Sequence, residues 1–210
     1  MNAIIFDLDG VLVFTDKFHY QAWKQLADRL GVYFDEEINN RLRGVSRMAS
    51  LDIVLERADR EYSQAEKEAM AAEKNDAYRE LLSTMTPADV SDKVRKTLAE
   101  LKRRGYKLAI GSSSKNAKFI LERVQLLDVF DAISDGTNIN RSKPDPEVFL
   151  KAAEFLGEAP EYCAVVEDAY AGIDAAKAGG MTAIGIGDAA GYEKADYHLE
   201  TFAQLETLQL

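Results

Sequence analysis

The stretch Ile4-Ile5-Phe6-Asp7-Leu8-Asp9-Gly10 decides how the rest of the chain is interpreted. It begins as a short apolar run, ends in two aspartates one residue apart, and closes on a glycine. Such a run is typical of a buried strand in a parallel sheet. Two aspartates beyond the end of that strand would lie at the carboxyl edge of the sheet, where open α/β folds bind ligands. The glycine allows a sharp turn and a close approach to the backbone.

The chain beyond this strand separates into a helical block and an alternating block. Apolar residues at helical spacing predict helices over 16–30, 36–42, 48–58 and 64–82, with no convincing strand among them. After Thr86-Pro87, strands are predicted at 107–110, 132–134, 163–166 and 182–186. The helices predicted around them run from the cap Ser91 to Gly105, from the cap Asn116 to Val124, from Asp145-Pro146 to Gly157, and over 169–178 and 202–208.

Alternating strands and helices predict an α/β fold with a parallel sheet covered on both faces. The helical block interrupts this alternation after the first strand. We therefore predict an α/β core made of residues 1–15 and 86–210, with an inserted helical cap domain at 16–85.

Composition bounds the class of protein. The 210 residues are 47% hydrophobic and 30% charged, and no apolar run approaches the length of a membrane-spanning helix. The single cysteine, Cys163, cannot form an internal disulfide, and no secretory signal is visible, so we expect a cytoplasmic protein. A net charge of −10 argues against nucleic-acid binding. We also expect no membrane partner, and a monomer.

Polar side chains follow four of the predicted strands. In a parallel sheet these positions lie at one edge, so they could converge. They are Asp7 and Asp9, Ser112-Ser113-Ser114, Lys143, and Glu167-Asp168. Several carboxylates without histidine or cysteine favour Mg²⁺ over Zn²⁺. A metal beside a lysine and backbone N–H donors suits a phosphoryl group in transfer, and an aspartate can be its nucleophile.

Each cluster taken alone also has a purely structural explanation. Asp168 could equally be a helix cap, Ser112–Ser114 a plain loop, and Lys143 a solvated lysine. Asp7 and Asp9 are harder to explain in this way, because two carboxylates directly after a buried strand repel each other unless a positive group binds them. The occurrence of all four clusters in this order favours a functional site.

In this order the four clusters resemble the four motifs of the haloacid dehalogenase superfamily of phosphotransferases. The resemblance covers essentially the whole chain and implies a Rossmann-like core with a helical cap. It implies Asp7 as nucleophile, Asp9 as general acid/base, and Ser112 and Lys143 as phosphate-holding residues. It further implies Mg²⁺ bound by Asp7, the backbone carbonyl of Asp9 and Asp168, with Glu167 as a ligand or just behind one.

The helical block narrows the resemblance to the β-phosphoglucomutase family. The stretches that carry it are 15–24, 43–51 and 73–78, together with Ser112-Ser113-Ser114-Lys115-Asn116 in the core. By this resemblance Arg47, Ser114, Lys115 and Asn116 would hold the phosphate distal to the reacting one. His19 and Lys74 would orient the sugar and couple cap closure to Asp9. The remaining residues assigned in this way are Thr15 among the catalytic group, and Gly44, Val45, Trp23 and Ser113 among the substrate-binding group.

The resemblance implies a Mg²⁺-dependent enzyme that interconverts β-D-glucose 1-phosphate and D-glucose 6-phosphate, through an aspartyl-phosphate and β-glucose 1,6-bisphosphate. A sugar-phosphate phosphatase of the same superfamily is the alternative, because the core motifs do not separate the two. A catalytically silent binding protein on the same fold is a third hypothesis. Individually, His19, Trp23 and Lys74 could also be ordinary packing or surface residues.

Two positions depart from the family pattern. Phe14 stands where many members carry an aspartate, so the hinge between core and cap is expected to differ. Ser113 stands where some relatives have a smaller residue, and its hydroxyl is expected to add a hydrogen bond at the phosphate.

Overall fold

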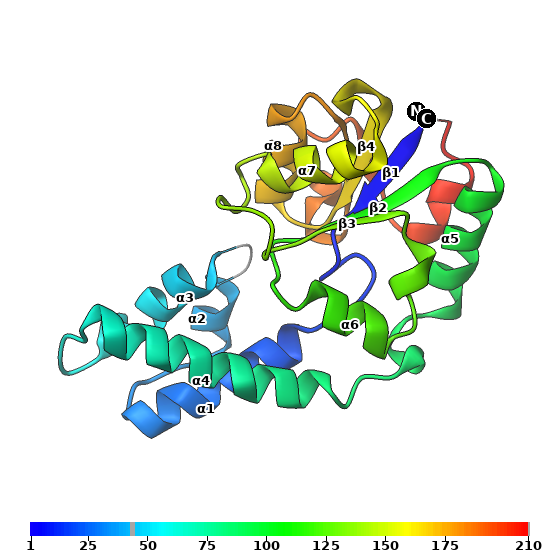
Figure 1. The fold of residues 1–210 in the computed structure, drawn as a ribbon. Helices are drawn as coiled ribbons and strands as arrows, with labels where there is room; N and C mark the ends of the chain where they lie inside the picture. The colour runs from blue at the N-terminus through cyan, green and yellow to red at the C-terminus, as the bar shows by residue number, and fades with distance from the viewer. Residues whose placement is uncertain (43–44, 210) are drawn as a thin grey trace. The chain divides into compact units, whose positions relative to one another are not determined.

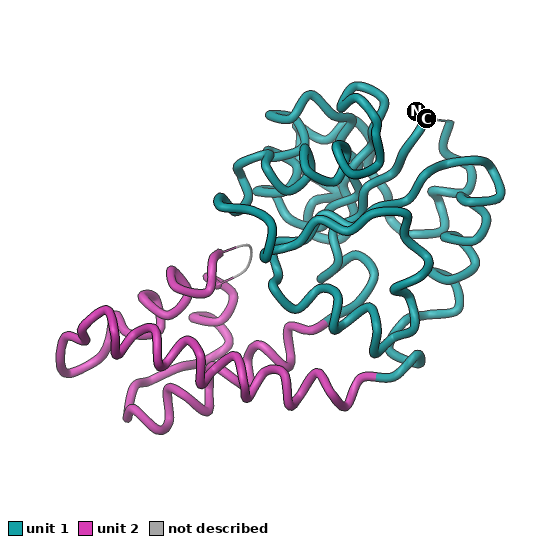
Figure 2. Tube along the Cα trace, in the orientation of Figure 1, with its two compact units in different colours: residues 1–14, 86–210 teal, residues 15–85 magenta. Residues whose placement is uncertain are grey.

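The computed structural model describes residues 1–42 and 45–209. Tertiary contacts divide the chain into two compact units (Figure 2). One is an α/β unit formed by Met1–Phe14 and Thr86–Leu210, and the other is a helical unit formed by Thr15–Met85. None of the helices in the described ranges is long and apolar enough to cross a membrane.

The α/β unit contains a six-stranded sheet in the order β3-β2-β1-β4-β5-β6, with every neighbouring pair parallel. The strands are β1 (Ala3–Phe6), β2 (Lys107–Gly111), β3 (Ala132–Ser134), β4 (Cys163–Glu167), β5 (Thr182–Ile186) and β6 (Tyr197–Leu199). The predicted parallel α/β fold is confirmed. Strand β6 was not predicted, because three residues with a single buried side chain carry no recognisable period.

Helices cover the sheet, with α7 (Glu147–Leu156) and α8 (Tyr170–Ala178) on one face and α5 (Asp92–Arg103) on the other (Figure 1). The described residues of the unit also form α6 (Ala117–Arg123) and the 3₁₀ turns η2 (Pro87–Asp89), η3 (Leu127–Val129), η4 (Pro160–Tyr162), η5 (Gly187–Gly191) and η6 (Phe202–Glu206). The helix predicted at 202–208 is therefore wrong in type, since this segment is the short 3₁₀ turn η6 packed against α5. Helix α7 begins one residue later than predicted, after Pro146.

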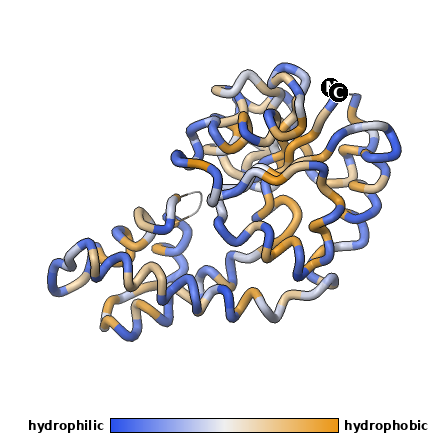
Figure 3. The backbone as a smooth tube through the Cα atoms, viewed as in Figure 1, coloured by the Kyte–Doolittle hydropathy of each residue, from blue (hydrophilic) through white to orange (hydrophobic). Residues whose placement is uncertain are grey.

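Alternation along β1 builds the two halves of the core, and the central strands form a hydrophobic band (Figure 3). Ile5 packs on the α7 and α8 side in a cluster that includes Phe149. Phe6 points to the opposite side, where its ring lies 6.2 Å from that of Phe130 and 5.8 Å from that of Phe202. All four residues of β1 are buried, as expected for a strand covered on both faces.

The helical unit is built from α1 (Asp16–Leu30), α2 (Glu36–Asn40), α3 (Arg47–Val54), η1 (Leu55–Arg57) and α4 (Gln64–Leu82). Helices α1 and α4 have the predicted bounds. The prediction of one helix over 48–58 is wrong, because Ser46 caps α3 one residue earlier and the chain tightens into η1 from Leu55. The prediction for 36–42 is too long at its end, since α2 stops at Asn40.

The two phenylalanines of α7 allow a matched test of the core. Phe149 is fully buried, whereas Phe155 on the same helix is 49% exposed. We expect Phe149→Ala to lower the free energy of unfolding by about 3–5 kcal/mol, because it leaves a cavity beneath the sheet. Phe155→Ala should cost less than about 1 kcal/mol. Urea unfolding of both variants checks this, and equal losses would contradict the packing described here.

Candidate active site

Strand β1 occupies the point where the direction of strand connection reverses. The chain leaves β1 for β2 on one side, and later returns to β4 on the other side. A crevice opens at the carboxyl edge of such a switch point. Asp7 lies there, directly after β1, and its N–H donates to the Val166 carbonyl at 3.0 Å, so that β1 pairs with β4 as far as the aspartate.

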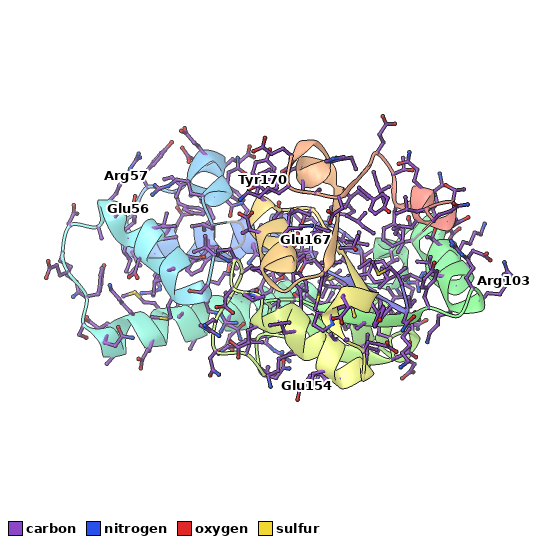
Figure 4. The ribbon with its side chains drawn as sticks, turned by 90° about the horizontal axis from the view of Figure 1, so that it is seen from above. Glu56, Arg57, Arg103, Glu154, Glu167 and Tyr170 are labelled. Carbon is purple, nitrogen blue, oxygen red and sulfur yellow. The ribbon has the colours of Figure 1, made fainter. Side chains whose placement is uncertain are left out.

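Lys143 joins the two central strands through a buried ion network. Its ammonium lies 2.6 Å from Asp7 Oδ1 and 2.6 Å from Glu167 Oε1. The side chains of Lys143, Asp7 and Glu167 are only 6%, 11% and 1% exposed, so water barely screens these pairs. Figure 4 shows Glu167 inside the α/β unit, in contrast to Arg103 and Glu154, which project from its surface.

Asp7 in this network and its neighbour Asp168 resist ionisation. The pKa of Asp7 is raised from 3.8 to about 7, because burial and the charges of Glu167 and Asp9 together outweigh the opposing effect of Lys143. Burial and the charges of Glu167 and Asp7 likewise raise the pKa of Asp168 to about 8. One ammonium therefore does not neutralise the cluster, and a further positive charge would stabilise it.

A divalent cation fits these residues. Asp7, Glu167 and Asp168 each present a carboxylate oxygen within 4.8 Å of the others. An all-oxygen donor set of this kind suits Mg²⁺. Two glycines leave space for these carboxylates: a Cβ on Gly10 would lie 1.9 Å from Asp168 Oδ2, and one on Gly172 would lie 1.9 Å from Glu167 Oε1.

Asp9 lies in the tight turn that follows β1. The N–H of Gly10 donates to the Val13 carbonyl at 2.7 Å, and Gly10 has a φ of +82°, which favours glycine. Asp9 itself is half-buried and forms an isolated β-bridge with Val13. The turn keeps Asp9 two residues from Asp7 at the same end of β1.

The loop after β2 is held by its own serines. The Ser112 N–H donates to the Ser134 carbonyl at 3.1 Å, which extends the pairing of β2 with β3. Ser112 Oγ accepts from the Ser114 N–H, and Ser114 Oγ accepts from the Asn116 N–H, both at 3.2 Å. Ser112 and Asn116 are buried, and Lys115 is exposed. Asn116 precedes α6 as predicted, but it forms no side-chain cap bond.

The helical unit also contains a buried charged side chain, that of Lys74. Lys74 is 3% exposed, and its Nζ lies 3.0 Å from His19 Nδ1 and over the rings of Trp23 and Tyr78. Burial, Lys74 and Arg47 hold the pKa of His19 well below its usual value, so the imidazole is neutral near pH 7. The Tyr78 hydroxyl donates to Thr15 Oγ1 at 3.0 Å, and the Tyr78 ring stacks on His19.

The other predicted residues of this unit differ in exposure. Arg47 is half-buried at the first position of α3, and burial lowers the pKa of its guanidinium. Val45 is exposed, whereas Trp23 is buried in the hydrophobic core of the unit. Gly44 lies outside the described residues. Phe14, the last residue before the helical unit, has a side chain that is 71% exposed.

Gly172 and Tyr78 were not among the predicted site residues. Gly172 is required by the close approach of Glu167, and its only signal was its position one turn after Asp168. Tyr78 contacts three predicted residues, but an aromatic residue on an amphipathic helix is usually explained by packing alone. Asp168 does not cap α8, because the residue before that helix is Ala169.

Comparison with known proteins identifies the family of this chain. Residues 1–180 match the model of the haloacid dehalogenase-like hydrolases. The chain belongs to this family. Its resemblance to the superfamily is thereby confirmed, and membership implies a Mg²⁺-dependent phosphotransferase, in agreement with the acidic cluster.

The chain is similar in sequence and in structure to individual members of the family. It is 43% identical over 189 residues to a β-phosphoglucomutase of Bacillus subtilis, covering 89% of this chain and 84% of the relative. It is 32% identical to a phosphorylated carbohydrates phosphatase of Thermotoga maritima, covering 88% and 84%. The solved structure of a Clostridium difficile β-phosphoglucomutase matches with a TM-score of 0.91 at 38% identity, covering 98% of this chain and 93% of that one.

The raised pKa values of Asp7 and Asp168 predict a pH-dependent metal affinity. Between about pH 4 and pH 8 the cation-free native state binds more protons than the unfolded chain, so these groups contribute less stability as the pH rises. Mg²⁺ must displace those protons. We expect its affinity to increase at least about tenfold between pH 6 and pH 7.5.

Thermal unfolding at increasing Mg²⁺ concentration measures this at both pH values. Asp168→Asn should bind Mg²⁺ more weakly and with a shallower pH dependence. Asp128→Asn, at an exposed position of η3, should behave as the unchanged protein. An affinity that is independent of pH would contradict the assignment of the cation to this cluster.

Proposed function

We propose that this chain is a β-phosphoglucomutase, which interconverts β-D-glucose 1-phosphate and D-glucose 6-phosphate. The observation that carries the chemistry is the buried Asp7 carboxylate, held by Lys143 beside Glu167 and Asp168 at the switch point of the sheet. The similarity to the Bacillus subtilis relative supports the substrate. In this proposal the protein is cytoplasmic and acts on a small phosphorylated sugar.

Asp7 is the nucleophile in this proposal. In its phosphorylated form it transfers the phosphoryl group to the 6-hydroxyl of β-glucose 1-phosphate, which gives β-glucose 1,6-bisphosphate and a free Asp7 carboxylate. After the bisphosphate turns around, Asp7 attacks the phosphorus at position 1. The bond from that phosphorus to the sugar oxygen breaks, glucose 6-phosphate leaves, and Asp7 is phosphorylated again.

Asp9 moves the protons of both half-reactions. It accepts the proton of the attacking sugar hydroxyl and returns one to the oxygen that leaves phosphorus. Lys143 and Ser112 hold the phosphoryl oxygens, and Lys143 stays protonated because the charges of Asp7 and Glu167 raise its pKa above the usual value against the effect of burial. Asp7, the Asp9 carbonyl and Asp168, with Glu167 beside them, would hold Mg²⁺, and the bound cation would supply positive charge opposite the phosphoryl group.

The helical unit acts as the cap in this proposal. Arg47 grips the phosphate that is not reacting, together with Ser114, Lys115 and Asn116, while Gly44 and Val45 contact the substrate. His19 and Lys74 orient the sugar, and Thr15 supports His19 through their shared neighbour Tyr78. Trp23 would act through Lys74, since its indole is buried. Exclusion of water then protects the aspartyl-phosphate from hydrolysis.

A phosphatase is the second candidate, and the similarity to the Thermotoga maritima phosphatase favours it. Both enzymes need the same acidic cluster and the same nucleophile. They differ in the acceptor of the aspartyl-phosphate, which is a sugar hydroxyl in the mutase and water in the phosphatase.

One assay separates the two candidates. With β-glucose 1-phosphate, Mg²⁺ and a trace of the bisphosphate, we expect glucose 6-phosphate to form without a stoichiometric release of phosphate. Both products are recorded together, with Asp7→Asn as the blank. Inorganic phosphate as the main product would establish the phosphatase instead.

Arg47 provides a test of the distal phosphate site. We expect Arg47→Ala to lower mutase kcat/KM by about 10- to 100-fold, since a charge-assisted hydrogen bond contributes roughly 1.5–3 kcal/mol. Hydrolysis of a small phosphomonoester such as phenyl phosphate should change by less than about threefold, because it has no second phosphate. Arg57→Ala, an exposed arginine of the same unit, should alter neither rate appreciably. An equal loss in both assays would remove Arg47 from the distal site.

A further inference from the structure

The hydroxyl of Ser113 is buried and unsatisfied. Its Oγ is shielded from water and has no hydrogen-bond partner, which is true of no other buried side-chain nitrogen or oxygen in the part of the chain that the structure describes. A buried hydroxyl without a partner is unfavourable, because it has lost its bonds to water and gained none. Such groups are rare in native proteins and call for a specific explanation.

The loop that contains Ser113 does not use this hydroxyl. The serines on either side are both engaged, since Ser112 Oγ accepts from the Ser114 N–H and Ser114 Oγ accepts from the Asn116 N–H. The Ser114 carbonyl accepts from the Gly136 N–H at 3.1 Å. Backbone packing is also tight at Ser113, where a Cβ on Gly136 would lie 2.4 Å from the Ser113 carbonyl oxygen. The backbone at Ser113 is therefore held in place without its side chain.

Ser113 lies at the same edge of the sheet as Asp7. Phe6 of β1 pairs with Ile110 of β2, so the residues after each strand emerge side by side at the carboxyl edge of the sheet. Ser113 lies in the segment between β2 and α6 (Figure 1). The residue as a whole is partly exposed, although its Oγ is not. Rotation about the Cα–Cβ bond moves the hydroxyl between staggered positions without moving the backbone.

We propose that Ser113 Oγ turns outward to donate a hydrogen bond to the phosphoryl group bound at Asp7, and that it is unsatisfied only while the site holds no such group. This inference rests on the proposed phosphoryl transfer to Asp7. A phosphoryl oxygen is a strong hydrogen-bond acceptor. When it binds, the Ser113 hydroxyl gains a hydrogen-bond partner that it lacks in the free protein. Ser113 thus increases phosphate affinity at the expense of the stability of the free protein, and it contacts the substrate without taking part in bond making.

The test measures stability and phosphate binding in the same variants, without any activity assay. Ser113→Ala removes an unsatisfied hydroxyl, so we expect the Tm of the free protein to stay the same or to rise. Its affinity for inorganic phosphate in the presence of Mg²⁺, measured by calorimetry, should fall by about fivefold or more. Ser134→Ala is the matched control, since Ser134 is buried and its Oγ accepts a hydrogen bond from Asn138. It should lower the Tm and leave phosphate affinity unchanged.

The outcomes separate the inference from the proposed function. Unchanged phosphate affinity in Ser113→Ala would overturn the inference whatever the Tm does. A Tm loss as large as that of Ser134→Ala would also overturn it, because the hydroxyl would then have a structural partner. If the enzyme proves to be a phosphatase but the affinity falls as expected, the inference stands and the mutase proposal fails.

Discussion

The buried ammonium of Lys143 is the interaction on which the α/β unit depends. It brings together Asp7, which follows β1, and Glu167, which ends β4, at 2.6 Å each. Burial raises the pKa of Asp7, and the charge and hydrogen bond of Lys143 oppose that rise. Lys143 lies in the segment between β3 and α7, so the ends of β1 and β4 and this segment are joined by one charge.

The cluster of Asp7, Glu167 and Asp168 contains more carboxylates than Lys143 can neutralise, and this excess of negative charge favours the binding of a cation. Burial first, and the charges of the neighbouring carboxylates in addition, raise the pKa values of Asp7 and Asp168. A protein site with such repulsion is suited to bind a divalent cation and then a phosphate dianion, each of which neutralises part of the other. The glycines at 10 and 172 have no Cβ that would prevent the carboxylates from converging.

Much of the architecture could be predicted because it follows from local periodicity. The buried strand 163–166 and the helices 16–30 and 64–82 have unambiguous patterns, and the structure agrees with them. Short elements were missed or assigned wrongly, such as β6 and the 3₁₀ turns η1 and η6. Three to five residues contain too little pattern, and their form is decided by the neighbours they pack on, as Phe202 packs on Phe6.

The sequence by itself determined the order of the four polar clusters and the strands that carry them, since hydrophobic periodicity and turn residues are local properties. It also determined the family, through motifs that are specific in combination. Tertiary structure alone decided that Lys143 pairs with both Asp7 and Glu167, and that His19 is neutral beside a buried Lys74. It also left the Ser113 hydroxyl without a partner between two engaged serines. These features depend on burial and on distances between segments remote in sequence, and neither quantity can be obtained from residue spacing.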